Sequence, residues 1–593
     1  MKNKIIIKLK EIFSLDYRSL ALLRIGMGIL LVMDALQRLE DLSAFYTDTG
    51  AVPRSVILSF WSNAWNFSLH TGFGAWPFEL ILFIIAIVAG FALIVGYRTL
   101  LATIISWVLL ISVHNRNPLV LQGGDVIFRA VLFWGMFLPW GKYFSVDYLL
   151  TQKKLLSKNF LSPASVAYIL QIVIFYFFSG YTKTGAQWVQ SGTAVYYALS
   201  IDQLSTAFGH FLLRFPQIMK GLTFTTIYLE IFGTFGFISP ILNGPVRTIT
   251  VFVFALFQIG INMSMHLGLF GFISIVITFG LLPSWFWEKC YQPVRNYFRM
   301  RSEKILTIYY DADCGFCTKT MWLLARILWL PKNVKIIKAQ SDAKIYEEME
   351  NEDSFIVITE DGMHHYRAEA LKYIISVSPI FFFVSYLFKI PKSLEFIDYV
   401  YKNIAKNRLK ICIKPKPESS TTKNLQIISG VFITLMFIIA FTHNIDSLPG
   451  HKGLIPQKLN FLVALTRIDQ RFDMFAPYPL VDDGWYVIPG ILADGRNVDL
   501  FRNGAPVVFT KPIDVAKLYS NQRWQKYMMN LWSNDFEKYR LSYGQYLCRD
   551  WNDSHEGKDQ LETFQIIYMK ETTLPDYEKP TVEPVTIWDH HCF

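Results

Sequence analysis

Nine long apolar segments constrain the fold of this chain more than any other feature. About 20 mostly apolar residues in a helix cross a bilayer core of about 30 Å, and nine segments reach or approach that length. Eight lie within residues 12–295, and the ninth stands alone much later. They are 17–36, 77–96, 99–113, 126–140, 164–180, 221–242, 246–263, 267–285 and 425–441. The sequence therefore predicts a polytopic α-helical membrane protein with about nine spans.

The composition agrees with a membrane protein. Charged residues make up 18% of the 593 residues, whereas soluble domains average about 25%. A disordered chain would need low hydrophobicity and high charge, which this chain lacks. Its net charge of +10 does not indicate nucleic acid, because basic residues on a hydrophobic chain more often flank membrane spans. We therefore expect a lipid bilayer as partner and no nucleic acid.

Clusters of basic residues set the expected orientation. They lie at 2–10, 142–158 and 289–304, and all three fall on one side if eight spans precede residue 289. The positive-inside rule makes that side the cytoplasm. The expected location is the cytoplasmic (inner) membrane, crossed several times.

Four regions follow from this layout. They are a membrane unit of eight spans (12–295), a cytoplasmic insert (302–415), a ninth span (424–443) and an external C-terminal α+β domain (445–593) in the periplasm or outside the cell. A polar stretch with two prolines, 414–423, joins the insert to the ninth span.

Cys314 and Cys317 carry the strongest chemical signal in the insert. A strand-like run, 304–310, precedes them, and 318–328 has helical apolar spacing. Where a strand turns into a helix, unpaired N–H groups and the helix dipole favour a thiolate. We expect Cys314 to be the more exposed and hence the nucleophile, with Cys317 as the resolving thiol that closes a disulfide with it. Strands and helices then alternate, and a Cys-x-x-Cys in such a pattern predicts an inserted α/β, thioredoxin-like redox domain.

Zinc binding and an inert pair are the alternatives for these cysteines. Zinc would need two more ligands. Cys412 and the pair His364-His365 are available, but their spacing fits no common zinc module. Redox chemistry is favoured, and no metal site is expected.

The run Tyr310-Asp311-Ala-Asp-Cys314-Gly-Phe-Cys317 resembles the signature of the DCC thiol-disulfide oxidoreductase family. The later run 401–408 resembles the closing helix of that family. The resemblance implies a thioredoxin-like fold with a redox-active cysteine pair, and it carries over Asp311, Cys314 and Cys317.

Ionisable residues in the predicted spans are functional or paired candidates, because charge at membrane depth is costly. For Arg24, Asp34 and Arg129 a structural salt bridge inside the bundle is the favoured interpretation. Lys183 ends the fifth span in an aromatic-rich stretch. Desolvation can turn such an amine into a base; the alternative is an interfacial lysine that reaches water.

Segments 15–26, 96–98, 144–147 and 171–183 together resemble the HTTM membrane domain. That domain is shared with vitamin K-dependent γ-glutamyl carboxylase, in which a lysine at the place of Lys183 is thought to abstract a proton while vitamin K hydroquinone is oxidised. The resemblance implies quinone binding, and it makes Lys183 a candidate base.

Arg24, Asp125 and Arg129 are our candidates for cofactor contact within this domain. Two departures count against carboxylation of glutamate. The carboxylase has essential histidines where this chain has about Gly124-Asp125 and Gln258.

The C-terminal region holds two cysteines, Cys548 and Cys592. Outside the cytoplasm an even pair favours a disulfide, so we expect that bond. His590-His591 beside Cys592 could bind metal, but an exposed tail is favoured. Apolar runs around Asp494-Gly495 predict a hairpin.

Three functions are consistent with these features. The favoured one is a membrane oxidoreductase whose cysteine pair exchanges electrons with a cytoplasmic thiol partner. The second is a carboxylase-like enzyme that modifies an exported protein with Lys183 as base. The third is a non-enzymatic module for export or maturation of proteins. About 30 Å of hydrocarbon would separate Lys183 from Cys314, and a diffusible quinone is the hypothesised link.

Overall fold

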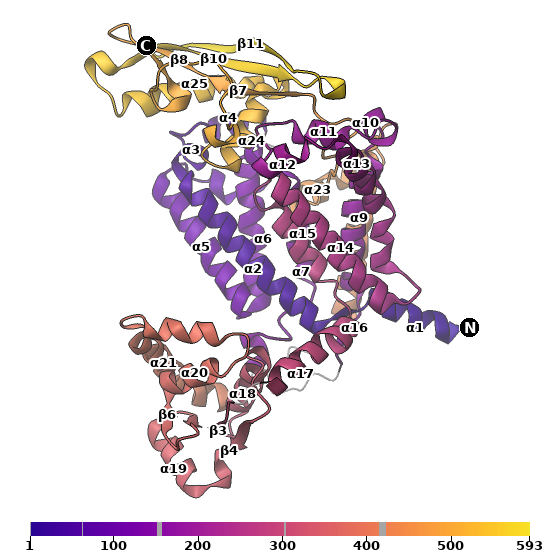
Figure 1. Cartoon of the computed structure of the whole chain (residues 1–593), viewed down its shortest axis with the longest axis vertical. Helices are drawn as coiled ribbons and strands as arrows, with labels where there is room; N and C mark the ends of the chain where they lie inside the picture. The colour runs from indigo at the N-terminus through magenta and orange to yellow at the C-terminus, as the bar shows by residue number, and fades with distance from the viewer. Residues whose placement is uncertain (1, 62, 64, 151–156, 302–303, 414–422) are drawn as a thin grey trace.

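The computed structural model describes residues 2–61, 63, 65–150, 157–301, 304–413 and 423–593. A helical bundle forms the middle of the molecule. A small α/β domain lies at one end of the bundle and a sheet domain formed by the C-terminal region lies at the other (Figure 1). The predicted joint at 414–423 lies outside the described residues except for its last position.

Seven helices in the described part are long and apolar enough to cross a membrane. Helices α2, α6 and α9 are mostly buried and form the centre, whereas the others expose broad apolar faces. The seven are α2 (Tyr17–Glu40), α5 (Trp76–Val95), α6 (Thr99–Arg116), α9 (Pro163–Tyr181), α13 (Pro216–Ile231) extended by η3 (Gly233–Ile238), α14 (Asn243–Ser264) and α22 (Lys423–Asp446).

The expected fourth and eighth spans take a different form. Helix α7 (Gly123–Gly135) has only 13 residues and is buried along almost all of its length, so protein surrounds it and its length need not match the bilayer. Helix α15 (Phe270–Phe279) ends early, and the chain bends by 81° into Ser284–Met300. Pro283 lies at this break, where it cannot continue a helix. Instead of the nine predicted spans, the described residues contain seven candidate spans, or eight if the bent helix pair forms one span.

Local sequence signals fix the ends of several helices. The Asp16 carboxylate accepts a hydrogen bond from the backbone N–H of Arg18 at 2.8 Å and caps α2. Ser162 and Ser165 form a capping box at the start of α9, with Pro163 in its first turn. Gly96, with φ +70°, ends α5 in the left-handed conformation that favours glycine.

The α/β domain is built on a four-stranded sheet of order β4-β3-β5-β6. Strands β3 and β4 are parallel, whereas β5 and β6 form an antiparallel hairpin beside β3. Its elements are β3 (Leu306–Tyr310), α18 (Gly315–Ile327), β4 (Val334–Lys338), η5 (Ala339–Ser341), α19 (Ala343–Glu352), β5 (Ile356–Ile358), β6 (His364–Tyr366), α20 (Arg367–Ser376), η6 (Phe382–Lys389) and α21 (Ser393–Ile413).

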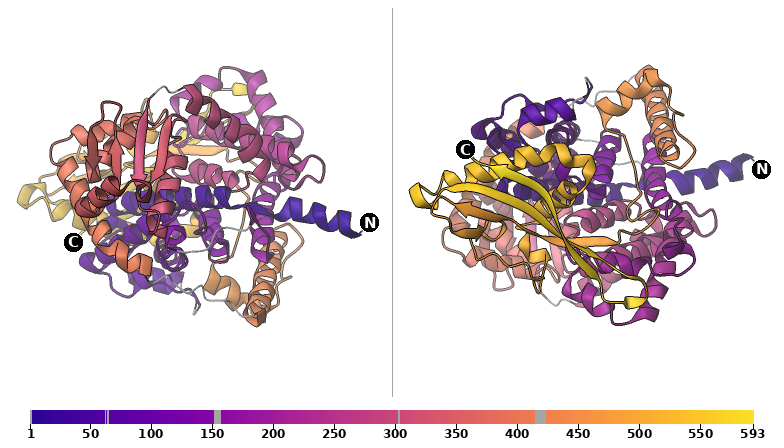
Figure 2. Two further views of the ribbon diagram at one scale, coloured as in Figure 1. Left: turned by 90° about the horizontal axis from the view of Figure 1, so that it is seen from below. Right: turned by 90° about the horizontal axis from the view of Figure 1, so that it is seen from above.

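The C-terminal region forms a five-stranded antiparallel sheet packed on two helices. Seen from above, this sheet lies across the end of the bundle (Figure 2). The predicted hairpin is confirmed, because β8 and β9 pair on either side of Asp494-Gly495. The elements are β7 (Asp482–Val487), β8 (Pro489–Leu492), β9 (Asn497–Asp499), α24 (Gln522–Trp532), α25 (Arg540–Asn552), β10 (Leu561–Thr572) and β11 (Thr581–His591).

The segment 467–479, which precedes the C-terminal sheet, packs several of its side chains into the bundle. The Gln171 amide donates to Oε1 of Gln470 at 2.7 Å, and the Trp188 indole donates to the carbonyl of Phe475 at 2.8 Å. Phe472 is buried against Phe175 of α9. The late part of the chain therefore supplies part of the core of the membrane unit.

Candidate functional site

Cys314 and Cys317 lie where β3 turns into α18. Cys314 is the N-cap residue of the helix, and its Sγ accepts a hydrogen bond from the backbone N–H of Cys317 at 3.4 Å. Backbone N–H groups of a first turn have no partner within the helix, and the helix dipole favours negative charge there. The position therefore favours a thiolate on Cys314 whenever this cysteine is reduced.

The exposure of the two cysteines differs from the prediction. Cys314 is only 7% exposed, whereas Cys317 is half-buried. The expectation that Cys314 is the more exposed is wrong, because its sulfur turns toward the first turn of α18. Cys314 is disulfide-bonded in the structure.

Asp311 holds the loop in front of the cysteines. Its carboxylate accepts hydrogen bonds from the backbone N–H groups of Asp313 at 3.0 Å and Cys314 at 3.3 Å, and from the Gln340 amide at 2.8 Å. A carboxylate oxygen of Asp311 and the two sulfurs lie within 4.8 Å of one another. Such a carboxylate can accept a thiol proton. Three ligands fall short of the four of a structural zinc site, and the described residues bring no fourth to this group.

Helix α18 also contacts the membrane unit. The Lys319 ammonium donates to the carbonyl of Tyr148 at 3.4 Å and lies 5.3 Å from the centre of its ring. Arg326 donates to the Tyr143 hydroxyl at 3.0 Å. Burial in this contact lowers the pKa of Lys319. The helix that begins at the cysteine pair thus contacts the connection after α7 through Tyr143 and the short helix α8 (Val146–Leu149) through Tyr148.

Residues 308–414 match the family model of the DCC1-like thiol-disulfide oxidoreductases. This chain carries a DCC1-like domain. The matched region contains both cysteines, and it closes with α21, as the resemblance predicted. Neither the curated proteins nor the solved structures include a match to the chain.

Outside the DCC1-like domain, Arg24 links separate segments of the bundle through hydrogen bonds. Its guanidinium is fully buried and donates to the main-chain carbonyls of Trp140 at 3.1 Å, Leu93 at 2.5 Å and Ile94 at 2.7 Å, and to that of Phe144. These carbonyls belong to the end of α5 and to the chain after α7. The expected salt bridge is therefore replaced by hydrogen bonds to the backbone.

Asp34 and Asp125 belong to a buried cluster of charges. Asp34 Oδ2 accepts from Arg38 at 2.8 Å, and Arg38 also donates to Asp125 at 3.2 Å. Arg523, from α24 of the C-terminal region, pairs with Asp34 and lies 3.7 Å from Asp125. His114 approaches Asp125 at 3.4 Å. Two arginines thus balance two aspartates at the junction of bundle and C-terminal domain. A cavity of about 20 Å³ beside Asp34 and Arg38 has room for a water molecule.

Arg129 connects α7 to the segment 467–479. It donates to the carbonyl of Arg467 at 2.8 Å and pairs with Asp469 at 3.1 Å. A salt bridge of Arg129 was expected, but its partner Asp469 lies more than 300 residues away in the sequence. Arg24, Asp125 and Arg129, the candidate cofactor contacts, all bind other parts of the protein.

Lys183 is buried. The alternative interpretation, an interfacial lysine whose side chain reaches water, is therefore wrong. Its ammonium donates to Glu230 at 2.6 Å, and to the carbonyl and hydroxyl oxygens of Ser179 at 2.9 and 3.0 Å. The Trp188 ring lies 5.2 Å away. A carboxylate and two further oxygen acceptors therefore surround the amine of Lys183.

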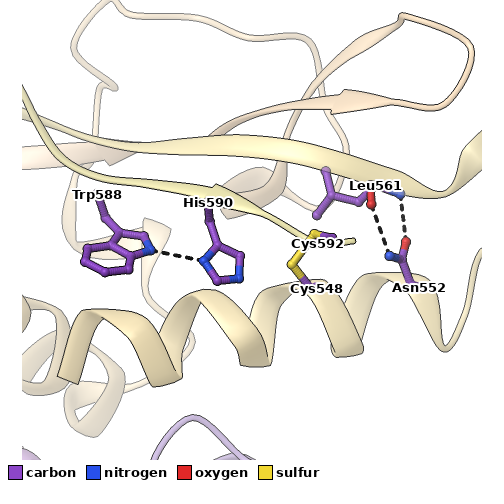
Figure 3. Close-up of a disulfide and its surroundings, with 6 residues drawn as sticks. All are labelled: Cys548, Asn552, Leu561, Trp588, His590 and Cys592. Atoms are coloured by element: carbon purple, nitrogen blue, oxygen red, sulfur yellow. Dashed lines mark hydrogen bonds between the residues drawn. A yellow bond between two sulfur atoms is a disulfide. The ribbon is translucent and has the colours of Figure 1, made fainter. Parts of the chain in front are cut away.

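Cys548 and Cys592 form a disulfide that ties α25 to the end of the chain, with a Cα–Cα distance of 5.5 Å (Figure 3). The end of the chain is not a loose tail, because β11 pairs with β10 as far as His591. His590 points from β11 toward α25 and accepts a hydrogen bond from the Trp588 indole at 3.2 Å (Figure 3).

Several residues of these sites escaped the sequence analysis. Arg38 could have been found, because it lies four residues after Asp34 on one helix face. Arg523, Asp469 and Gln340 carried no local signal, since their partners are distant in sequence.

Proposed function

We propose that this protein is a membrane-bound thiol–disulfide oxidoreductase that works through Cys314 and Cys317 of its DCC1-like domain. The single observation that carries the proposal is the match of residues 308–414 to this family, with both cysteines at the start of α18. The βαβ unit followed by a hairpin and a helix supports a thioredoxin-like fold.

The proposed exchange has two steps that conserve electrons. The Cys314 thiolate attacks one sulfur of a substrate disulfide, forms a mixed disulfide, and releases the other substrate sulfur as a thiolate that takes up a proton. The Cys317 thiolate then attacks Cys314 and closes the pair, which releases the second substrate thiol. The substrate gains two electrons and the pair loses two. Asp311, within 4.8 Å of both sulfurs, would accept the proton that Cys317 loses.

The closeness of the two sulfurs supports these roles, because both Sγ atoms and a carboxylate oxygen of Asp311 lie within 4.8 Å of one another. In a mixed disulfide on Cys314, the resolving sulfur must lie close to the sulfur that it attacks. Cys317 occupies that place in the structure.

The arrangement of the domains supports two compartments. The DCC1-like domain and the C-terminal disulfide lie at opposite ends of the bundle (Figure 1). Disulfides persist in oxidising compartments and are rare in the cytosol. We infer that the DCC1-like domain faces the cytoplasm, where its partner would be a thiol protein, and that the C-terminal domain faces outward.

Trapping of mixed disulfides tests this function. Purified full-length Cys317→Ser should accumulate a mixed disulfide with glutathione on Cys314, because the resolving thiol is missing. Cys314→Ser should not, and Cys290→Ser, which changes a half-buried cysteine outside the pair, should behave like the original protein. Mass spectrometry of the intact chain reads the adduct. Equal adducts on Cys317→Ser and Cys314→Ser would refute the assigned roles, and none on either would refute the function.

A further inference from the structure

The DCC1-like domain exposes an apolar surface that is not covered by any of the residues the structure describes. We call it the η6–α21 face. It is formed by side chains of η6, of Ile390 and of one side of α21, each more than a third exposed. Its members are Phe382, Phe383, Tyr386, Leu387, Ile390, Phe396, Tyr399, Val400 and Ile404. Soluble surfaces rarely gather so many large apolar side chains, and such patches mark protein or membrane contacts.

Helical spacing shows that this face is distinct from the core of the domain. Phe396, Val400 and Ile404 follow one another at intervals of four and form one stripe of α21. Tyr401 and Ala405, on the neighbouring side, pack into the domain: the Tyr401 hydroxyl accepts from the Phe355 N–H, and Ala405 is buried. The helix therefore has an apolar stripe beyond the one that its own domain uses.

Charge around the η6–α21 face is mainly positive. Lys389, Lys392 and Lys406 are exposed at its border against one exposed carboxylate, Glu395, and Lys402 pairs with Asp398 at 2.8 Å. Lysines beside exposed apolar and aromatic side chains are typical of helices that lie in the interface of an anionic bilayer.

The connections of the chain hold this face near the bilayer. Helix α21 ends at Ile413, and the candidate span α22 begins at Lys423, a separation of at most about 35 Å even for an extended chain. Helices α20 and α21 lie at the end of the domain nearest the bundle, and α19 lies at the far end (Figure 1).

Helix α1 (Lys2–Phe13) repeats the pattern at the same end of the bundle. It extends away from the bundle (Figures 1 and 2) and exposes both isoleucines and lysines between Lys4 and Lys10. Two basic, apolar elements thus flank the same end of the membrane unit. We propose that the η6–α21 face and α1 rest on the anionic lipid headgroups of one leaflet, so that the DCC1-like domain lies against the membrane.

Photocrosslinking in the full chain tests this contact. p-Benzoylphenylalanine would replace Phe383 or Phe396, with Met363 as the control. Phe383 and Met363 are each 55% exposed. Met363 immediately precedes β6, and that strand lies farther from the bundle than α21 (Figure 1). The protein is reconstituted in vesicles of phosphatidylglycerol and phosphatidylcholine, irradiated, and analysed by mass spectrometry.

Phe383 and Phe396 should yield lipid adducts at least about fivefold above Met363, because interfacial helices bury their apolar side chains among acyl chains. Lys389→Gln with Lys392→Gln should lower the yield in anionic vesicles toward that in pure phosphatidylcholine. Lipid adducts equal to those of Met363, or crosslinks to a second protein chain instead, would overturn the proposal. An adduct yield that is the same in anionic and in pure phosphatidylcholine vesicles would overturn the proposed contact between the lysines and anionic headgroups. These outcomes do not depend on the redox function.

Discussion

Arg523 should be the side chain of the C-terminal domain on which the stability of the membrane unit most depends. Its guanidinium is 6% exposed and reaches Asp34 and Asp125 inside the bundle. Arg523→Ala would leave Arg38 alone against two buried carboxylates. Removing one partner of a buried ion pair costs about 3–5 kcal/mol, because an unpaired buried charge remains.

The assay is the free energy of unfolding in dodecylmaltoside micelles titrated with sodium dodecyl sulfate. Arg496→Ala is the matched control, because this arginine also pairs with two aspartates in the C-terminal domain but is largely exposed; it should leave unfolding unchanged. Asp125→Asn in the Arg523→Ala background restores the charge balance, and a coupling of about 1–3 kcal/mol is expected. A loss below about 1 kcal/mol for Arg523→Ala would refute the reasoning, since that is the contribution of a surface pair.

Three further predictions concern other sites. Burial and the nearby Asp202 raise the pKa of Asp483 from 3.8 to about 7, so its contribution to stability is full below pH 4 and is lost as the pH rises through 7. The unfolding free energy should fall by up to about 4 kcal/mol between pH 4 and 8, and Asp483→Asn should remove this dependence. Cys548→Ser with Cys592→Ser should lower the thermal midpoint through a loss of about 2–4 kcal/mol. Lys183→Ala should destabilise by about 3–5 kcal/mol because Glu230 stays buried without its cation.

Each of these has an outcome that contradicts it. A pH profile that Asp483→Asn leaves unchanged would show that another group titrates. A reductant that leaves the midpoint unaltered would show that the disulfide adds no stability. Glu230→Gln added to Lys183→Ala should recover part of the loss, and no recovery would mean that the ion pair is not the cause.

The sequence predicted the local features of the fold well. The apolar runs located the long helices, because a bilayer demands both length and hydrophobicity. The motif around Cys314 and Cys317 located the DCC1-like domain, because the strand, the loop and the helix are neighbours along the chain. The break at Pro283 was missed, since the bundle relieves its buried segments of the length that lipid imposes.

Partners of buried charges could not be predicted in the same way. Arg129 and Asp469 are separated by 340 residues, and Asp34 meets Arg523 across an even longer interval. Hydrophobic periodicity says which face of a helix is buried but not which distant segment covers it. The burial of Lys183 could not be predicted for the same reason, because its ion-pair partner Glu230 lies on another helix.

The segment 467–479 has a consequence for biosynthesis. A ribosome that has finished α14 has not yet made the residues that occupy the space beside α7 and α9, where Gln171 meets Gln470. The early helices must therefore wait in the lipid as an incomplete assembly until more than three quarters of the chain has been translated. Truncated forms that stop before residue 467 would leave Arg129 without its counter-ion, and quality-control proteases would be expected to degrade them.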